Sequence, residues 1–248
     1  MLFTLIDKWG LRQYSQAMNS DLIHADNINL NFGEVVVLQD VGFVIPQGAF
    51  VSILGPNGAG KTQLLRIMLG LLPPSSGSIT RHFTLSEVGY VPQRLAVDPT
   101  FPITVKEFLQ MYLQTNLLPL FDDMFAVTDL FTKRIGKLSG GQLQRVLLAG
   151  VLSTKPKVLF LDEFSSGIDP RGQAELYNYL HRLNEQSGVT IVMVSHDVDI
   201  TAQYADVVLC LNKELICTGR PRDIFTQANF QKMYGIPLTK VDQHHHDD

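Results

Sequence analysis

Apolar positions near the start of the chain fall in short runs rich in β-branched residues, at 21–32, 35–45 and 49–55, separated by Gly, Asn and Pro. Runs of this length and composition predict strands. From Lys61 the apolar spacing becomes that of a helix, and the stretch PPSSG at 73–77 is expected to end it. The first third of the chain therefore predicts several strands followed by one helix.

The middle of the chain has a helical period of apolar residues, at 104–114, 118–131 and 143–153. Beyond it the pattern becomes one of continuous apolar runs interrupted by helical segments such as 171–186. These runs lie at 157–163, 189–197 and 206–211. Such alternation is typical of a parallel sheet buried on both faces. The pattern predicts an α/β core with a helical insert at about 94–136.

Composition narrows this picture. A chain of 248 residues with 45% hydrophobic content is long enough for one large domain, or for a domain with an inserted subdomain. The formal net charge of −4 gives no support to a nucleic-acid partner. No apolar run reaches the roughly 18 to 20 residues that span a bilayer, and no secretory signal is visible. We therefore expect the chain to stay in the cytosol.

The two cysteines lie in apolar strands on either side of an expected turn at Asn212 and Lys213. In a regular hairpin register Cys210 would face Leu215, and Cys217 would be its diagonal neighbour at about 7 Å. That separation is usually too long for a disulfide. Both thiols are therefore expected to be reduced and buried in the core.

A glycine-rich loop lies between the apolar run FVSIL and the first predicted helix. It matches G-x-x-x-x-G-K-[ST], and its residues are Gly55, Pro56, Asn57, Gly58, Ala59, Gly60, Lys61 and Thr62. Backbone N–H groups of such a loop wrap phosphates, the lysine neutralises them, and the threonine hydroxyl ligates Mg²⁺. The alternative is a strand-to-helix turn without a ligand. The strand, loop and helix in sequence favour a ligand that carries phosphate groups.

Two carboxylates end the apolar run VLFLDE. A strand buried on both faces would deliver Asp162 to the phosphate site, where it is expected to hold Mg²⁺. Glu163 is expected to be the catalytic base that positions or deprotonates the attacking water. Paired acids are also common at helix caps, so the prediction depends on their order after the phosphate loop.

A second anion-binding turn, LSGGQ, precedes the helix at 143–153. It consists of Leu138, Ser139, Gly140, Gly141 and Gln142, and it carries no lysine. These residues resemble the signature motif of the ATP-binding-cassette (ABC) ATPases. In that family the signature of one subunit closes over the ATP held by the phosphate loop of the other. The resemblance thus implies a head-to-tail homodimer, which explains why one chain carries two phosphate turns.

Further motifs of this family follow in order. The resemblance makes Phe32 the ring that stacks on adenine, and Gln93 a catalytic residue that senses magnesium and contacts the membrane partner. It makes 166–169, SGID, the loop that crosses the dimer interface, with Asp169 at the nucleotide. His196 corresponds to the switch histidine at the γ-phosphate, and Lys61 is counted among the catalytic residues. Without the other motifs, Phe32 would also fit a residue of the hydrophobic core, and His196 would also fit a structural histidine at the end of a strand.

The resemblance covers nearly the whole chain, from Asp21 to about Leu215. It implies a P-loop core with an antiparallel β subdomain and an inserted helical subdomain. We expect an N-terminal extension at 1–20, an ABC ATPase domain at 21–235 with its helical insert at about 94–150, and a polar histidine-containing tail at 236–248.

Four positions depart from the family pattern. Gln63 stands where a second hydroxyl is usual, although we still expect it to contact the nucleotide. Phe164 replaces the usual proline and Phe32 the more frequent tyrosine. Gly150 replaces an arginine, and a glycine inside a helix costs roughly 1 kcal/mol relative to alanine. These changes are expected to tune affinity and local stability without removing the chemistry.

Two classes of function fit an ABC ATPase: the energising subunit of a membrane transporter, and a soluble protein that acts on DNA or ribosomes. The short helical insert, the single cassette and the lack of a basic stripe favour transport. A regulator that only binds ATP conflicts with the intact set of Lys61, Asp162, Glu163 and His196. The expected partners are an integral membrane permease and, through it, an extracytoplasmic metal-binding protein. The chain would lie peripherally on the cytoplasmic face of the inner membrane.

The cargo is inferred from the stretch GYVPQRLAVDPTFPITVKEFL and from QRVLLA, which resemble the zinc and manganese importers. ATPase subunits of siderophore or haem importers remain the alternative. Zinc is preferred because three imidazoles in the tail, His244, His245 and His246, with Asp247 and Asp248, suit Zn²⁺ better than Mn²⁺. A solvated tail without function is the plainer interpretation. At the other end, Leu2, Leu5, Ile6 and Trp9 form either a membrane-touching helix face or a frayed extension ahead of Met18.

Overall fold

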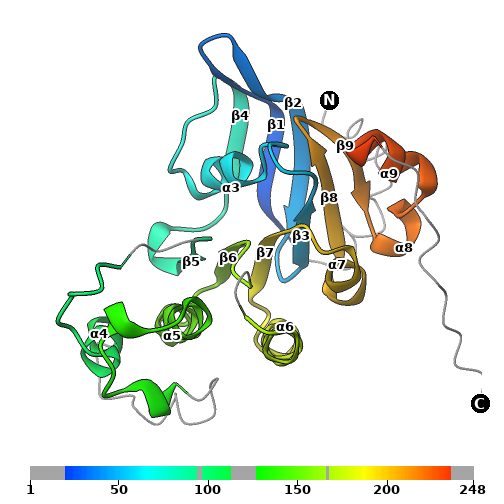
Figure 1. The fold of residues 1–248 in the computed structure, drawn as a ribbon. Helices are drawn as coiled ribbons and strands as arrows, with labels where there is room; N and C mark the ends of the chain where they lie inside the picture. Colours follow the sequence, from blue (N-terminus) through cyan, green and yellow to red (C-terminus); the bar gives the residue numbers. More distant parts are fainter. Residues whose placement is uncertain (1–19, 94–96, 113–126, 166–167, 236–248) are drawn as a thin grey trace, which may run out of the picture.

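The computed structural model describes residues 20–93, 97–112, 127–165 and 168–235. Three strands from the first third of the chain form a small antiparallel sheet. The strands are β1 (Asp21–Phe32), β2 (Val35–Pro46) and β4 (Ser76–Arg81), in the order β2-β1-β4. Apolar side chains of β1 and β2 that point to one face are buried. This sheet packs beside the main sheet at the upper part of Figure 1.

Within the described residues, the main sheet has six strands in the order β5-β6-β7-β3-β8-β9. They are β3 (Phe50–Leu54), β5 (Val88–Val91), β6 (Val158–Asp162), β7 (Thr190–Ser195), β8 (Val207–Asn212) and β9 (Glu214–Gly219). All pairs are parallel except that of β8 with β9. The carboxyl ends of the parallel strands therefore lie at one edge of the sheet.

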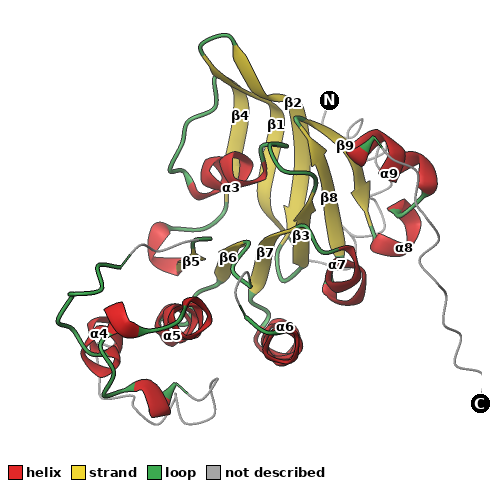
Figure 2. Ribbon diagram, in the orientation of Figure 1, coloured by secondary structure: helices red, strands yellow, loops and turns green. Residues whose placement is uncertain are grey.

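Successive strand residues belong alternately to two hydrophobic cores. In β6, Val158 and Phe160 pack in the core shared with the small sheet and α3 (Lys61–Leu69), whereas Leu159 and Leu161 pack in the core under α5 (Gly140–Ser153) and α6 (Pro170–Ser187). Figure 2 shows these helices on opposite faces of the sheet. A strand with two buried faces needs continuous apolar residues, which explains the runs in the sequence.

The remaining helices are short. They are α4 (Val105–Tyr112), α7 (Val198–Tyr204), α8 (Pro221–Ile224) and α9 (Gln227–Tyr234), with 3₁₀ turns at Leu85–Glu87, Thr128–Leu130 and Ile135–Lys137. A third core joins α4 to α5. Of the helix expected at 118–131, only 127–131 lies in the described part of the chain, where it contains a 3₁₀ turn. None of the described helices is long and apolar enough to cross a membrane.

Gly150 lies where α4 crosses α5. A Cβ atom at this position would come within 3.0 Å of Cδ2 and 3.1 Å of Cε2 of Tyr112. The glycine that the sequence marks as a cost to helix stability therefore makes room for an aromatic ring of the neighbouring helix. Packing between the helices offsets part of the cost in helix propensity.

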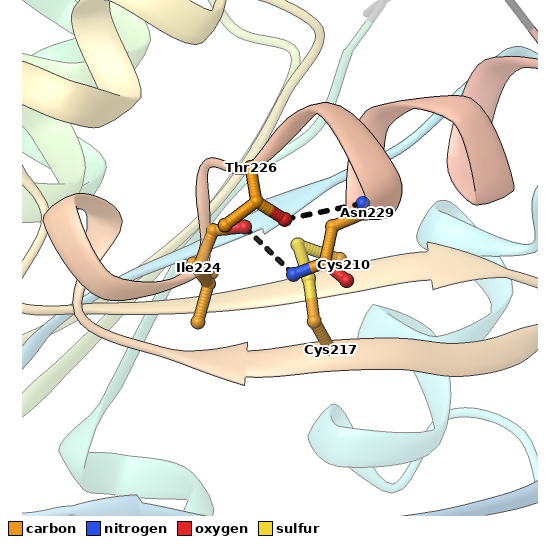
Figure 3. Close-up of a disulfide and its surroundings, with 5 residues drawn as sticks. All are labelled: Cys210, Cys217, Ile224, Thr226 and Asn229. Carbon is orange, nitrogen blue, oxygen red and sulfur yellow. Dashed lines mark hydrogen bonds between the residues drawn. A yellow bond between two sulfur atoms is a disulfide. The ribbon is translucent and has the colours of Figure 1, made fainter.

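The expectation of two separate reduced thiols is wrong. Cys210 and Cys217 face each other directly and form a disulfide, with their Cα atoms 5.0 Å apart. A bulge lies between the pair Leu211 and Leu215 and the pair Cys210 and Cys217, so the register shifts by one residue. Figure 3 shows the bridge across β8 and β9, beneath the connection from α8 to α9. Because the sequence does not show the bulge, a regular register misplaced the cysteines.

Candidate active site

The loop between β3 and α3 needs glycine at two positions. Gly60, the N-cap of α3, has a φ of 94°, and a Cβ atom there would lie 2.7 Å from Leu38 Cδ2. A Cβ atom on Gly55 would overlap the carbonyl oxygen of Leu211. The loop is also held from β8 and β9, because the Lys213 N–H at their turn donates to the carbonyl of Ala59 at 3.0 Å. The backbone therefore presents the N-terminus of α3 in a fixed orientation, where an anion is favoured.

Lys61 begins α3 and its ammonium group lies inside the loop. Its Nζ donates to the carbonyl oxygens of Gly55 at 2.8 Å and Pro56 at 3.0 Å. It also lies 3.6 Å from Oε1 of Glu163. The positive charge is thus held beside the helix N-terminus and beside the acids that follow β6.

Asp162 ends β6 and is 2% exposed. Its Oδ1 accepts a hydrogen bond from the hydroxyl of Thr62 at 3.0 Å. Burial raises the pKa of Asp162 above its ordinary value, an effect that the bond from Thr62 opposes and the neighbouring charge of Glu163 reinforces. The protein thus holds a carboxylate in a place where an unbalanced negative charge is unfavourable.

Glu163 follows with an unusual backbone. Its φ is 43°, in the left-handed region that side-chain-bearing residues rarely occupy, and its N–H donates to Val194 of β7 at 3.2 Å. Its Oε2 accepts a bond of 2.6 Å from Nε2 of Gln93, which lies just after β5. Three elements far apart in sequence therefore meet at this carboxylate.

These groups surround an open cavity of about 560 Å³. Its lining comprises Phe32, Val37, Asn57, Gly58, Ala59, Gly60, Lys61, Thr62, Gln63, Gln93 and Glu163. Phe32 presents half of its side chain to solvent, at 52% exposure, so it is a cavity wall rather than a core residue. Val37 was not anticipated, because a valine in an apolar strand run carries no sign of a binding role.

The signature residues lie apart from this lining. Ser139 is the N-cap of α5: its hydroxyl accepts from the Gln142 N–H at 3.3 Å, and its own N–H donates to the Gln142 side chain at 3.2 Å. Gly140 and Gly141 form the first turn of the helix. The cavity and the signature turn are therefore two separate surfaces of one chain.

Asp169 and His196 also lie outside the cavity lining. Asp169 caps α6, and the bond of 3.0 Å from the Gly172 N–H holds the pKa of its carboxyl below the usual range. His196 follows β7 and is exposed. Ser166 and Gly167 of the expected interface loop, the N-terminal extension and the histidine tail lie outside the described residues.

The arrangement suits the hydrolysis of a polyphosphate. It combines a helix N-terminus, a lysine, a pair of oxygen ligands in Thr62 and Asp162, and a further carboxylate with its own hydrogen-bond donor. The helix N-terminus and the lysine stabilise negative charge, Thr62 and Asp162 offer oxygen atoms that suit a cation, and Glu163 can accept a proton. An aromatic wall at Phe32 adds a surface for a flat ring.

Comparison with known proteins agrees with this geometry. Residues 38–166 match the family described as ABC transporter. The chain is 38% identical over 244 residues to the zinc import ATP-binding protein ZnuC of Hydrogenovibrio crunogenus, covering 92% of this chain and 94% of that protein. It is 41% identical over 217 residues to ZnuC of Yersinia pseudotuberculosis, covering 86% and 85%. A metal-chelate type ABC transporter in an inward-facing conformation has the same fold, with a TM-score of 0.75 at 24% identity over 88% of this chain and 90% of that one.

Proposed function

Because the chain belongs to the ABC transporter family, we propose that it is the ATP-hydrolysing subunit of a zinc importer. The observation that carries the proposal is the cavity in which Lys61, Thr62, Gln93 and Glu163 meet, in a chain 38% identical to a zinc import ATP-binding protein over 92% of its length. The chain is an ATPase of this family, and zinc is the cargo that its curated relatives are named for.

ATP would bind with its phosphates at the loop and α3. The N–H groups of Gly58 and Gly60 and the ammonium of Lys61 stabilise the phosphate oxygens, and Phe32 stacks on the adenine. Gln63 contacts the nucleotide from the first turn of α3, since it lines the same cavity. The loop is held from β8 and β9 before any ligand arrives, so little ordering is needed on binding.

A magnesium site fits the residues beside the phosphate loop. The hydroxyl of Thr62 and the carboxylate of Asp162 are 3.0 Å apart, and oxygen ligands of this kind suit Mg²⁺. Bound Mg²⁺ would neutralise negative charge on the β- and γ-phosphates. A cation beside Asp162 would also favour the ionised form of an acid whose pKa burial raises.

Glu163 is the proposed base. Its Oε2 accepts from Gln93, and its Oε1 lies 3.6 Å from the Lys61 ammonium. A bound phosphate that engages Lys61 would leave Oε1 to accept a proton from the attacking water. Gln93 orients this carboxylate, and we propose that it also responds to the metal and to the permease. His196, at the end of the neighbouring β7, is proposed to contact the γ-phosphate.

The cassettes of this family form dimers and work with a membrane permease. We place Ser139, Gly140, Gly141, Gln142 and Asp169 against the nucleotide of the partner subunit, because none of them lines the cavity of its own chain. The subunit is peripheral to the membrane, and we propose the cytoplasmic face of the inner membrane. An extracytoplasmic zinc-binding protein would deliver the ion to the permease.

Replacement of the base tests the hydrolytic role. The Glu163→Gln variant keeps the shape of the side chain but cannot accept a proton, so the ATPase rate should fall by about 10²- to 10⁴-fold while ATP still binds. Glu175→Gln, an exposed change on α6, is the matched control and should hydrolyse at the parent rate. A Glu163→Gln variant as fast as the parent would show that Glu163 is not the base.

Deletion of the gene tests the cargo. Cells without it should stop growing under metal chelation, and added zinc should restore growth. Rescue by manganese or haem alone would contradict the zinc assignment and leave the ATPase activity standing.

A further inference from the structure

The backbone of Glu163 is held in a conformation that it would not adopt by itself. A left-handed φ of 43° is unfavourable for a residue with a Cβ atom and persists only where the surroundings over-determine it. One restraint is the N–H bond to Val194 on the side of β7. The other restraints come from α6, through the two residues that follow Glu163.

We propose that Tyr177 and Gln173, on one face of α6, are positioning residues for the Glu163 carboxylate. They are four positions apart, so both side chains point to the same side of the helix. The phenol of Tyr177 donates to Oγ of Ser165 at 2.8 Å. The amide of Gln173 donates to the carbonyls of Ser165 at 3.1 Å and Ile168 at 3.0 Å. The inference rests on the proposed function, in which Glu163 is the base.

Aromatic packing fixes the residue between Glu163 and Ser165. The ring of Phe164 is 1% exposed and meets the ring of Tyr177 edge to face, with centroids 5.7 Å apart. Tyr177 also stacks against the ring of Tyr204 of α7, with centroids 5.8 Å apart. Tyr177 is therefore packed against two rings, and in this close-packed interior a shift of Phe164 would disturb Tyr177.

The hydroxyl of Tyr177 is a dependable donor. The residue is 3% exposed, and burial raises the pKa of its phenol to about 12, so it remains protonated at every pH at which the protein works. Positions 164 and 165 are thus tied to α6 through a ring and a hydrogen bond, while position 163 is tied to β7. The carboxylate between these anchors stays at the 2.6 Å bond with Gln93.

This arrangement predicts an effect on catalysis but not on nucleotide binding. The phosphate loop is held from β8 and β9 through Lys213, and within the described part of the chain none of its hydrogen bonds or ion pairs involves α6. Loosening the segment after Glu163 should therefore lower kcat and leave the KM for ATP unchanged. General damage to the fold would change both values together with the melting temperature.

The test uses the full-length ATPase and removes the hydrogen bond between Tyr177 and Ser165 by replacing either the donor or the acceptor. Tyr177→Phe and Ser165→Ala each remove that bond and keep the ring packing. Each should lower kcat by about threefold to tenfold, and the double variant should be no slower than either single variant, since both remove the same interaction. Tyr204→Phe is the control: it removes a phenol bond to Asn178, 2.9 Å long, within the same ring stack. It should hydrolyse ATP at the parent rate.

Hydrogen exchange at the Glu163 amide gives a second readout that does not depend on hydrolysis. Exchange should be faster in Tyr177→Leu, or in Tyr177→Phe if the leucine variant does not fold, and unchanged in Tyr204→Phe. Parent kcat in both Tyr177→Phe and Ser165→Ala, or an equal loss in Tyr204→Phe, would overturn the proposal. If the parent hydrolyses no ATP, the proposed function fails, and the exchange data alone decide: unchanged exchange in the Tyr177 variants refutes positioning, and faster exchange supports it.

Discussion

Reduction of the bridge between Cys210 and Cys217 should lower the stability of the protein by a measurable amount. The two cysteines are separated by 7 positions, and β8 and β9 pair directly beside them. In the chain-entropy model, a cross-link that closes a loop of this length removes unfolded-state entropy worth about 2 kcal/mol. For a chain of 248 residues, that loss corresponds to a fall in Tm of about 4–8 °C.

The assay is thermal unfolding followed by circular dichroism, on samples prepared fully oxidised and fully reduced with dithiothreitol. Thiols counted in denaturant establish the state of each sample before heating, because a mixture would not unfold in a two-state manner. The matched control is the double variant Cys210→Ala and Cys217→Ala, whose Tm should not respond to dithiothreitol. Both sulfur atoms are buried, so the reducing step needs an unfolded or partly opened protein.

Two results would refute this reasoning. If the unreduced protein has two free thiols, the bridge is not formed and the bulge between β8 and β9 is misplaced. The second result is a bridge that is present without an effect on Tm. If the oxidised sample and the reduced sample melt at the same temperature, the cross-link does not restrict the unfolded chain as its loop length predicts. An equal fall in Tm in the alanine control would assign the effect to the reagent.

Three further outcomes follow from the site. Burial raises the pKa of Asp162 above 3.8, so the folded state binds the proton of this carboxyl more tightly than the unfolded state does. The free energy of unfolding should therefore fall as pH rises from about 3.8 through the raised pKa. Asp162→Asn should remove this pH dependence, measured by urea unfolding, and raise Tm at pH 7. Gly55→Ala should lower Tm and ATP affinity, because its Cβ atom overlaps a backbone oxygen, whereas Gly42→Ala, with its nearest neighbour at 3.6 Å, should change neither. Ser139→Arg should prevent the ATP-dependent dimer seen by size-exclusion chromatography and leave the ATP affinity of the monomer intact. The control is Thr226→Arg, which removes a comparable helix N-cap, worth about 1 kcal/mol, and should still dimerise.

The sequence predicts those parts of the site whose residues lie close together along the chain. FVSIL, the glycine loop and the helix from Lys61 follow one another within a short stretch, and each has its own period or turn signal. The acids Asp162 and Glu163 after VLFL are predictable for the same reason, since a fully apolar run indicates a strand buried on both faces. Their expected places beside the loop agree with the bond between Thr62 and Asp162.

Contacts between distant segments are not predictable in this way. Gln93 and Glu163 are 70 positions apart, and the bond between their side chains depends on the pairing of β5 with β6. The bulge that aligns the cysteines leaves Ile216 without an opposite residue in β8, and nothing in the sequence around Ile216 indicates this. Gly150 shows the same limit, because only the position of Tyr112 explains why a glycine is accommodated there.

Because the parallel strands share one orientation, mutations that affect stability and mutations that affect catalysis fall in different parts of the sheet. The strand interiors carry no chemistry, so substitutions there are judged by stability alone, whereas the loops at the carboxyl edge of the sheet hold Gly60, Gln93, Glu163 and His196. Loops at the opposite edge contribute no residue to the cavity lining, although some stabilise the fold, as Gly48 does through its bonds with Thr190 and Asn184. Over evolutionary time the opposite edge can accept insertions while the rate of ATP turnover stays constant, so lineages of this protein should differ in length there first.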